Sequence, residues 1–128
     1  KPNLRELTEL CGQPLDTPAQ WHAAARALVA RGQAEVVALT LGHLGALLVT
    51  RDGAWNAQPL PIQVASAVGA GDSFVGGMVW ALQHHRPLTE AFAWGVAAGS
   101  AALLSVSTGL CCREDAQQLF AQVQTTPL

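Results

Sequence analysis

The chain has 128 residues, of which half are hydrophobic and only 12% are charged, whereas about 25% are charged in an ordinary soluble domain. Its net charge of -2, with no basic stripe among its four tryptophans and three phenylalanines, argues against a nucleic-acid partner. The length allows one domain with a hydrophobic core, and the scarcity of charge predicts either that much of the chain is buried or that part of its surface faces another domain or subunit.

Two helices open the chain. Asn3 is a typical N-cap, and Glu6 three residues later completes the pattern of a capping box. Thr17 followed by Pro18 starts a second helix, whose apolar positions recur at helical spacing until Gly32. We therefore expect one short and one longer helix before the first strand.

Four short segments then have the character of strands: residues 35–41, 46–50, 54–58 and 62–65. The first is rich in β-branched and apolar residues, which predicts a strand buried on both faces of a parallel sheet. Asp52 followed by Gly53 predicts a hairpin turn between the second and the third. The alternation of helix and buried strand predicts an α/β fold.

Three more helices are predicted: from Asp72 to before Pro87, from Glu90 to about Val106 with Thr89 as its cap, and from Arg113 to Val123. The second of these carries small residues on one face, at Gly95, Ala98, Gly99 and Ala102. Such a face admits either another backbone or a flat ligand, and the spacing leaves both open. Residues 91–110 carry no charge, but their glycines and hydroxyl groups favour a buried helix over a membrane span.

The cysteines and histidines predict no metal site. Three cysteines, with Cys111 and Cys112 adjacent, match neither a disulfide framework nor the spacing of zinc ligands. They predict buried free thiols in a reducing compartment, which we expect to be the cytoplasm. His43, His84 and His85 lack ligand-like partners in sequence, so we expect them on the surface or in loops.

Residues 67–74, AVGAGDSF, place a glycine turn directly before a helix, an arrangement whose unpaired N–H groups bind anions. Gly69 and Gly71 can adopt backbone angles closed to other residues and allow a phosphate to approach. The Asp72 carboxylate would repel a bound anion, but it fits a base that takes a proton from a hydroxyl as a phosphoryl group arrives. The alternative is a plain N-cap aspartate, and these eight residues do not decide between the two. A Walker-type P-loop is disfavoured, because Asp72 stands where that motif needs lysine.

The stretch AVGAGDSFVGGMVWAL resembles the signature of the ribokinase-like sugar kinases, in particular the phosphofructokinase B family. Three further segments resemble that family in the same order along the chain: KPNLREL, LTLGHLGALLV and GVAAGSAALLSVSTGL. The resemblance implies a ribokinase-like three-layer α/β/α fold with a mostly parallel sheet. It also implies that residues 1–128, which lack an initiator Met, are the C-terminal part of such a domain, without the sugar-binding part and its lid.

The resemblance implies roles for individual residues. Asp72 would be the general base, and Gly69, Ala70 and Gly71 would form the anion hole. ATP would be bound by Lys1, Asn3, Thr40, Gly42, Gly45, Val96, Gly99 and Ser100. Glu6, together with Asn3, would hold Mg²⁺ through water, while the local alternative for this pair is a capping box alone. Backbone carbonyls would bind K⁺ at Ser66, Val68, Ala102, Ser105 and Ser107.

The function implied is transfer of a phosphoryl group from ATP to a hydroxyl of a phosphosugar, fructose 6-phosphate or fructose 1-phosphate, giving fructose 1,6-bisphosphate. Two alternatives stay open: a nucleotide-binding module without catalysis, and a kinase of tagatose 6-phosphate. The resemblance also implies a homodimeric full-length protein with neither a membrane nor a nucleic-acid partner. Residues 1–128 alone are expected to be inactive, because most of the acceptor site would be missing.

Overall fold

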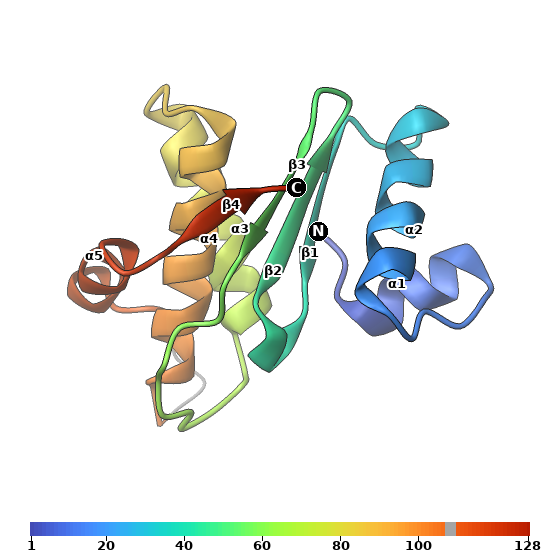
Figure 1. The fold of residues 1–128 in the computed structure, drawn as a ribbon. Coiled ribbons are helices and arrows are strands. Elements are labelled where there is room, and N and C mark those ends of the chain that lie inside the picture. Colours follow the sequence, from blue (N-terminus) through green and yellow to red (C-terminus); the bar gives the residue numbers. More distant parts are fainter. Residues whose placement is uncertain (107–109) are drawn as a thin grey trace. The chain divides into compact units, whose positions relative to one another are not determined.

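The computed structural model describes residues 1–106 and 110–128 and divides the chain into two compact units (Figure 1). The first unit comprises Lys1–Asn56 with Thr126–Leu128, and the second comprises Ala57–Thr125. No helix in the described ranges is both long and apolar enough to cross a bilayer. Each unit has its own core and is treated separately below.

The first unit contains two helices and most of a four-stranded sheet. Its elements are α1 (Leu4–Cys11), α2 (Pro18–Ala30), β1 (Val36–Thr40), the 3-10 helix η1 (Gly42–Leu44), β2 (Ala46–Thr50) and β3 (Ala54–Ala57). The sheet has the order β1-β2-β3-β4, where β4 is Thr125–Pro127. Figure 1 shows α1 and α2 on one side of the sheet, where Leu7, Ala25, Leu39 and Val49 form the fully buried centre of the core.

Both opening helices have the predicted caps. The Thr17 hydroxyl accepts the N–H of Gln20, and the Gln20 side chain accepts the N–H of Thr17, which makes a second capping box in addition to that of α1. Pro18 occupies the first turn of α2, where its missing N–H costs nothing. Gly12 ends α1 in the left-handed conformation. The predicted caps, Asn3 and Thr17, are confirmed.

The parallel pairing predicted for the first strand is not confirmed. β1 pairs antiparallel with β2, from Val36 opposite Thr50 to Thr40 opposite Ala46. The connection at residues 41–45 is short, whereas a parallel neighbour needs a crossover of a dozen or more residues. Parallel pairing in the described part of the chain is an isolated bridge between Asn3 and Thr40.

The hairpin predicted at Asp52 and Gly53 is confirmed. The Thr50 hydroxyl accepts the N–H groups of Asp52 and Gly53 at 3.1 and 3.2 Å. The Thr50 N–H donates to the Gly53 carbonyl at 2.9 Å. Thr50 is only 9% exposed, and its buried hydroxyl finds its partners in the N–H groups of the turn between β2 and β3.

The second unit is built on three helices, α3 (Ala70–Gln83), α4 (Leu88–Leu103) and α5 (Arg113–Phe120). Small residues bring α3 and α4 together: a Cβ built on Gly77 would lie 2.6 Å from the Trp94 carbonyl oxygen, and one on Gly99 would lie 3.2 Å from the Ala70 carbonyl oxygen. Between α4 and α5 lies a second core of Ala97, Ala101, Ala116 and Leu119. The small-residue face of α4 is therefore occupied by the backbone of another helix.

Several predicted boundaries in this unit are wrong. Residues 62–65 form no strand, because the N–H groups of Ala65 and Ser66 donate to the Leu103 carbonyl instead of to a neighbouring strand. α4 begins at Leu88 after Pro87, so Thr89 lies inside the helix. α5 ends at Phe120, and the short strand that follows it was not predicted. Cys112 is exposed, so the prediction that all three free cysteines are buried is also wrong.

Candidate active site

The glycine turn before α3 leaves backbone donors unpaired. Gly69 is the N-cap, with a left-handed backbone (φ 82°) that favours glycine. The first helical bond runs from the Ser73 N–H to the Gly69 carbonyl at 2.9 Å. The N–H groups of Ala70, Gly71 and Asp72 have no acceptor among the described residues. The turn can therefore bind an anion, although Gly71 is already helical and needs no unusual backbone angle.

Asp72 is the third residue of α3 and not its N-cap, so the alternative of a plain capping aspartate is wrong. Its side chain is exposed and has no hydrogen-bond or ion-pair partner in the described part of the chain. The positive end of the helix dipole stabilises a carboxylate in the first turn. The arrangement presents an accessible proton acceptor beside three open N–H donors.

The segment before the glycine turn reaches the end of α4, which brings together part of the predicted K⁺ set. The Ser66 N–H donates to the Leu103 carbonyl at 3.3 Å, and the Ser105 N–H donates to the Ala102 carbonyl at 3.2 Å. The Val68 N–H donates to the Ser66 hydroxyl at 3.3 Å. Ser107, the remaining member of the set, lies outside the described residues.

The three residues of α4 that were predicted to bind ATP are largely enclosed. Val96 is only 6% exposed, and Gly99 is buried where α3 approaches. Ser100 is partly accessible. Packing against α3 explains why position 99 is glycine, and the contact of these three residues with ATP stays a prediction.

In the first unit, several residues predicted to bind ATP meet at the end of β1. The Thr40 N–H donates to the Pro2 carbonyl at 3.1 Å, beside the bridge between Asn3 and Thr40. The Lys1 ammonium group donates to the Thr40 hydroxyl at 3.3 Å. The following loop turns through Gly42 (φ 61°) and Gly45 (φ 94°). The structure thus groups Lys1, Asn3 and Thr40 and places the two glycines directly after them.

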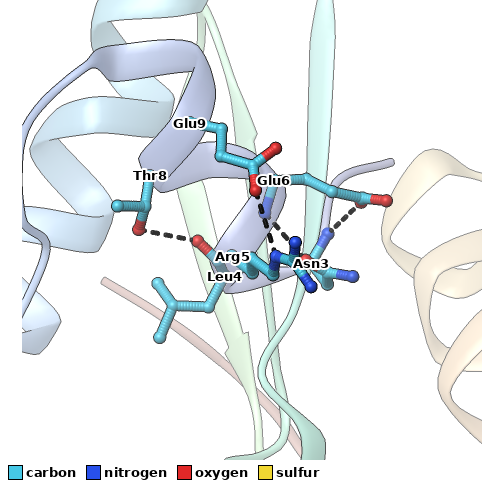
Figure 2. A network of polar contacts seen from close by, with 6 residues as sticks. All are labelled: Asn3, Leu4, Arg5, Glu6, Thr8 and Glu9. Atoms are coloured by element: carbon cyan, nitrogen blue, oxygen red, sulfur yellow. Dashed lines mark hydrogen bonds and ion pairs between the residues drawn. The ribbon is translucent and has the colours of Figure 1, made fainter.

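Asn3 and Glu6 form the capping box of α1 (Figure 2). The Asn3 side-chain oxygen accepts the Glu6 N–H, and Oε2 of Glu6 accepts the Asn3 N–H, both at 2.8 Å. Oε1 of Glu6 has no partner among the described residues, and both side chains are exposed. No group of three or more His, Cys, Asp or Glu side chains in those residues could hold a metal directly. Asn3 and Glu6 therefore do form the capping box, and Oε1 of Glu6 remains available to a ligand.

Sequence reasoning missed one contact beside Asp72. The Ser73 hydroxyl accepts the Cys111 N–H at 3.2 Å, and Ser73 is only 5% exposed. The two residues lie 38 positions apart, so no local pattern could have shown the contact. It joins the first turn of α3 to the segment that leads into α5.

The chain is similar to two curated phosphofructokinases. It is 41% identical over 121 residues to the ATP-dependent 6-phosphofructokinase isozyme 2 of Escherichia coli, covering 94% of this chain and 39% of that protein. It is 35% identical over 127 residues to the 1-phosphofructokinase of the same organism, covering 99% of this chain and 40% of that protein. The chain thus spans about two fifths of the length of these relatives.

A crystal structure of E. coli phosphofructokinase-2 in complex with potassium matches the fold with a TM-score of 0.90 and 40% identity. The match covers 94% of this chain and 39% of that one, and it confirms the ribokinase-like α/β fold that the resemblance implied. The sequence profile of the pfkB family of carbohydrate kinases matches residues 1–116 of this chain. The chain belongs to the pfkB family of carbohydrate kinases.

Proposed function

We propose that this chain carries the catalytic base and part of the nucleotide site of a kinase that transfers a phosphoryl group from ATP to a hydroxyl of a phosphosugar. The acceptor is fructose 6-phosphate or fructose 1-phosphate, and the product is fructose 1,6-bisphosphate. The observation that carries the proposal is the first turn of α3, where the exposed Asp72 carboxylate stands beside unpaired N–H groups. The names of the two relatives support the same substrates.

Asp72 and the turn divide the chemistry between them. The acceptor hydroxyl gives its proton to the Asp72 carboxylate while its oxygen bonds to the γ-phosphorus, and the bond to the leaving ADP oxygen breaks. The N–H groups of Ala70 and Gly71 stabilise negative charge on the transferred group. A turn that only bound phosphate would gain nothing from a carboxylate at this position.

The nucleotide phosphates would meet Lys1 and Thr40, with Gly42 and Gly45 leaving space for close backbone approach. Oxygen ligands suit Mg²⁺, which usually keeps several waters, so Oε1 of Glu6 fits a water-mediated contact to an ATP-bound ion. When bound, the ion would neutralise phosphate charge. The capping box would hold Glu6 in place for that contact.

We extend the proposal to K⁺, which backbone carbonyls of Ser66, Val68, Ala102 and Ser105 would bind. The contact between Ser66 and the end of α4 supports it, as does the potassium named for the related crystal structure. We also extend it to a homodimer, which sedimentation of the complete gene product would test.

Asp72→Asn in the complete gene product tests the proposal. Amide for carboxylate removes the base but keeps the size, so we expect kcat with ATP and fructose 6-phosphate to fall by about 10²-fold or more, with ATP binding retained. Asp115→Asn is the matched control, because Asp115 also lies in the first turn of a helix of the second unit. A normal kcat in Asp72→Asn would show that Asp72 is not the base and would favour the alternative that this chain only binds nucleotide.

A further inference from the structure

Hydrogen bonds tie the end of α4 and the segment that leads into α5 to the two sides of the glycine turn. Before the turn, the N–H groups of Ala65 and Ser66 donate to the Leu103 carbonyl at 2.7 and 3.3 Å. After it, the Cys111 N–H donates to the Ser73 hydroxyl at 3.2 Å. Leu103, the last residue of α4, and Cys111, which precedes the N-cap of α5, are thus held to the segments that flank Gly69–Asp72.

Ser73 has a role in this arrangement that packing alone does not require. It is only 5% exposed, and a buried hydroxyl needs a hydrogen-bond partner, which the Cys111 N–H provides. Its own N–H closes the first helical bond onto the Gly69 carbonyl. Alanine lacks the hydroxyl oxygen and could not accept the Cys111 N–H, so the contact depends on the hydroxyl.

We propose that Ser73 is a positioning residue for phosphoryl transfer: its hydroxyl holds Cys111 against the first turn of α3 and thereby fixes the direction in which Asp72 and the open N–H groups point. The inference rests on the function proposed above. Ser73 acts through its chain neighbour Asp72 and need not touch the substrate. A small displacement of a base or of an anion hole lowers the rate of transfer strongly, because the reacting atoms must be held in line.

Hydrogen exchange on the 128-residue chain measures the contact directly. In Ser73→Ala, we expect the Cys111 amide to exchange on the order of 10-fold faster, because its acceptor is gone. Ser73→Thr keeps a hydroxyl oxygen and should keep most of the protection. An unchanged Cys111 exchange rate in Ser73→Ala would overturn the inference.

Steady-state kinetics of the complete gene product then separate positioning from folding. We expect Ser73→Ala to lower kcat per folded molecule on the order of 10-fold with the KM for fructose 6-phosphate unchanged, and Ser73→Thr to restore most of kcat. Leu119→Val is the matched control, because Leu119 is buried in the core between α4 and α5 and takes no part in the hydrogen bond between Ser73 and Cys111. It should lower stability without lowering kcat.

The outcomes of the two experiments are distinguishable. Faster exchange at Cys111 with an unchanged kcat would make Ser73 a purely structural residue and overturn the positioning role. That result would leave the proposed function intact, because the function is tested separately by Asp72→Asn. A loss of kcat in Leu119→Val as large as that in Ser73→Ala would also overturn the positioning role, because it would trace the loss to lower stability.

Discussion

Gly76 and Gly77 are neighbours in α3, yet the structure predicts opposite effects of the same substitution. A Cβ on Gly77 would lie 2.6 Å from the Trp94 carbonyl oxygen and 2.8 Å from Cβ of Ala98, whereas nothing lies within 4 Å of one on Gly76. Alanine gains about 1 kcal/mol over glycine in a helix interior. At Gly76 this gain is realised, so Gly76→Ala should stabilise the second unit by roughly 0.5–1 kcal/mol.

At Gly77 the gain is outweighed, because overpacking against a backbone oxygen costs about 1–3 kcal/mol and the helices must separate. We expect a net loss of about 1–2 kcal/mol, so the two variants should differ by roughly 2 kcal/mol or more. Gly95→Ala should also be destabilising, because a Cβ there would lie 2.6 Å from Cγ of the buried Met78 and 3.1 Å from the Phe74 carbonyl oxygen.

Urea unfolding followed by circular dichroism and by tryptophan fluorescence would measure these differences. Trp80 on α3 and Trp94 on α4 have ring centroids 5.1 Å apart, so their emission reports the contact between the two helices. Equal stability of Gly76→Ala and Gly77→Ala would refute the close packing of α3 on α4. It would also reopen the small-residue face of α4 to a ligand.

Two further predictions concern carboxylates in helix first turns. The Cys112 thiol donates to the Glu114 carboxylate at 2.8 Å and lowers the pKa of Glu114 below its ordinary value of 4.5. Cys112→Ala should raise the pKa of Glu114 in an NMR titration. The variant should be less stable than the wild type at neutral pH, and this difference should vanish as the pH falls through the lowered pKa, because a protonated carboxyl no longer gains from the thiol. A Glu114 pKa unchanged from wild type would contradict this. Glu6→Gln should keep the capping box, and with it the stability of α1, yet weaken the Mg²⁺ dependence of ATP binding measured by calorimetry. An unchanged Mg²⁺ dependence of ATP binding, with or without a loss of stability, would contradict the metal role of Glu6.

Local signals predicted the first unit well. Asn3, Glu6, Thr17 and Pro18 each act within one helical turn, so their effect can be seen in a few consecutive residues. The same holds for the turn of β2 and β3, which a two-residue pattern determines. The glycine turn before α3 belongs to this class too, although its helix begins two residues earlier than the position of Asp72 suggested.

Interactions between distant residues account for the failures. Residues 62–65 have strand-like composition, but Ala65 donates to Leu103, a partner that no local pattern reveals. The antiparallel pairing of β1 with β2 was missed because a buried apolar strand looks the same in either orientation. The contact between Ser73 and Cys111 likewise joins residues that only the folded chain brings together.

The state of each helix N-terminus explains why α3 is where an anion should bind. In α1 and α2 the capping side chains, Asn3 and Thr17, use up first-turn N–H groups. The cap of α3 is Gly69, which has no side chain to do so, and the donors stay open. α4 and α5 also lack a side-chain cap, but Glu90 in the first turn of α4 is paired with Arg86, and two acidic residues in the first turn of α5 would repel an anion. In the proposed function, the open N–H groups of α3 would bind the phosphoryl group, and the Asp72 carboxylate beside them would accept the proton of the attacking hydroxyl.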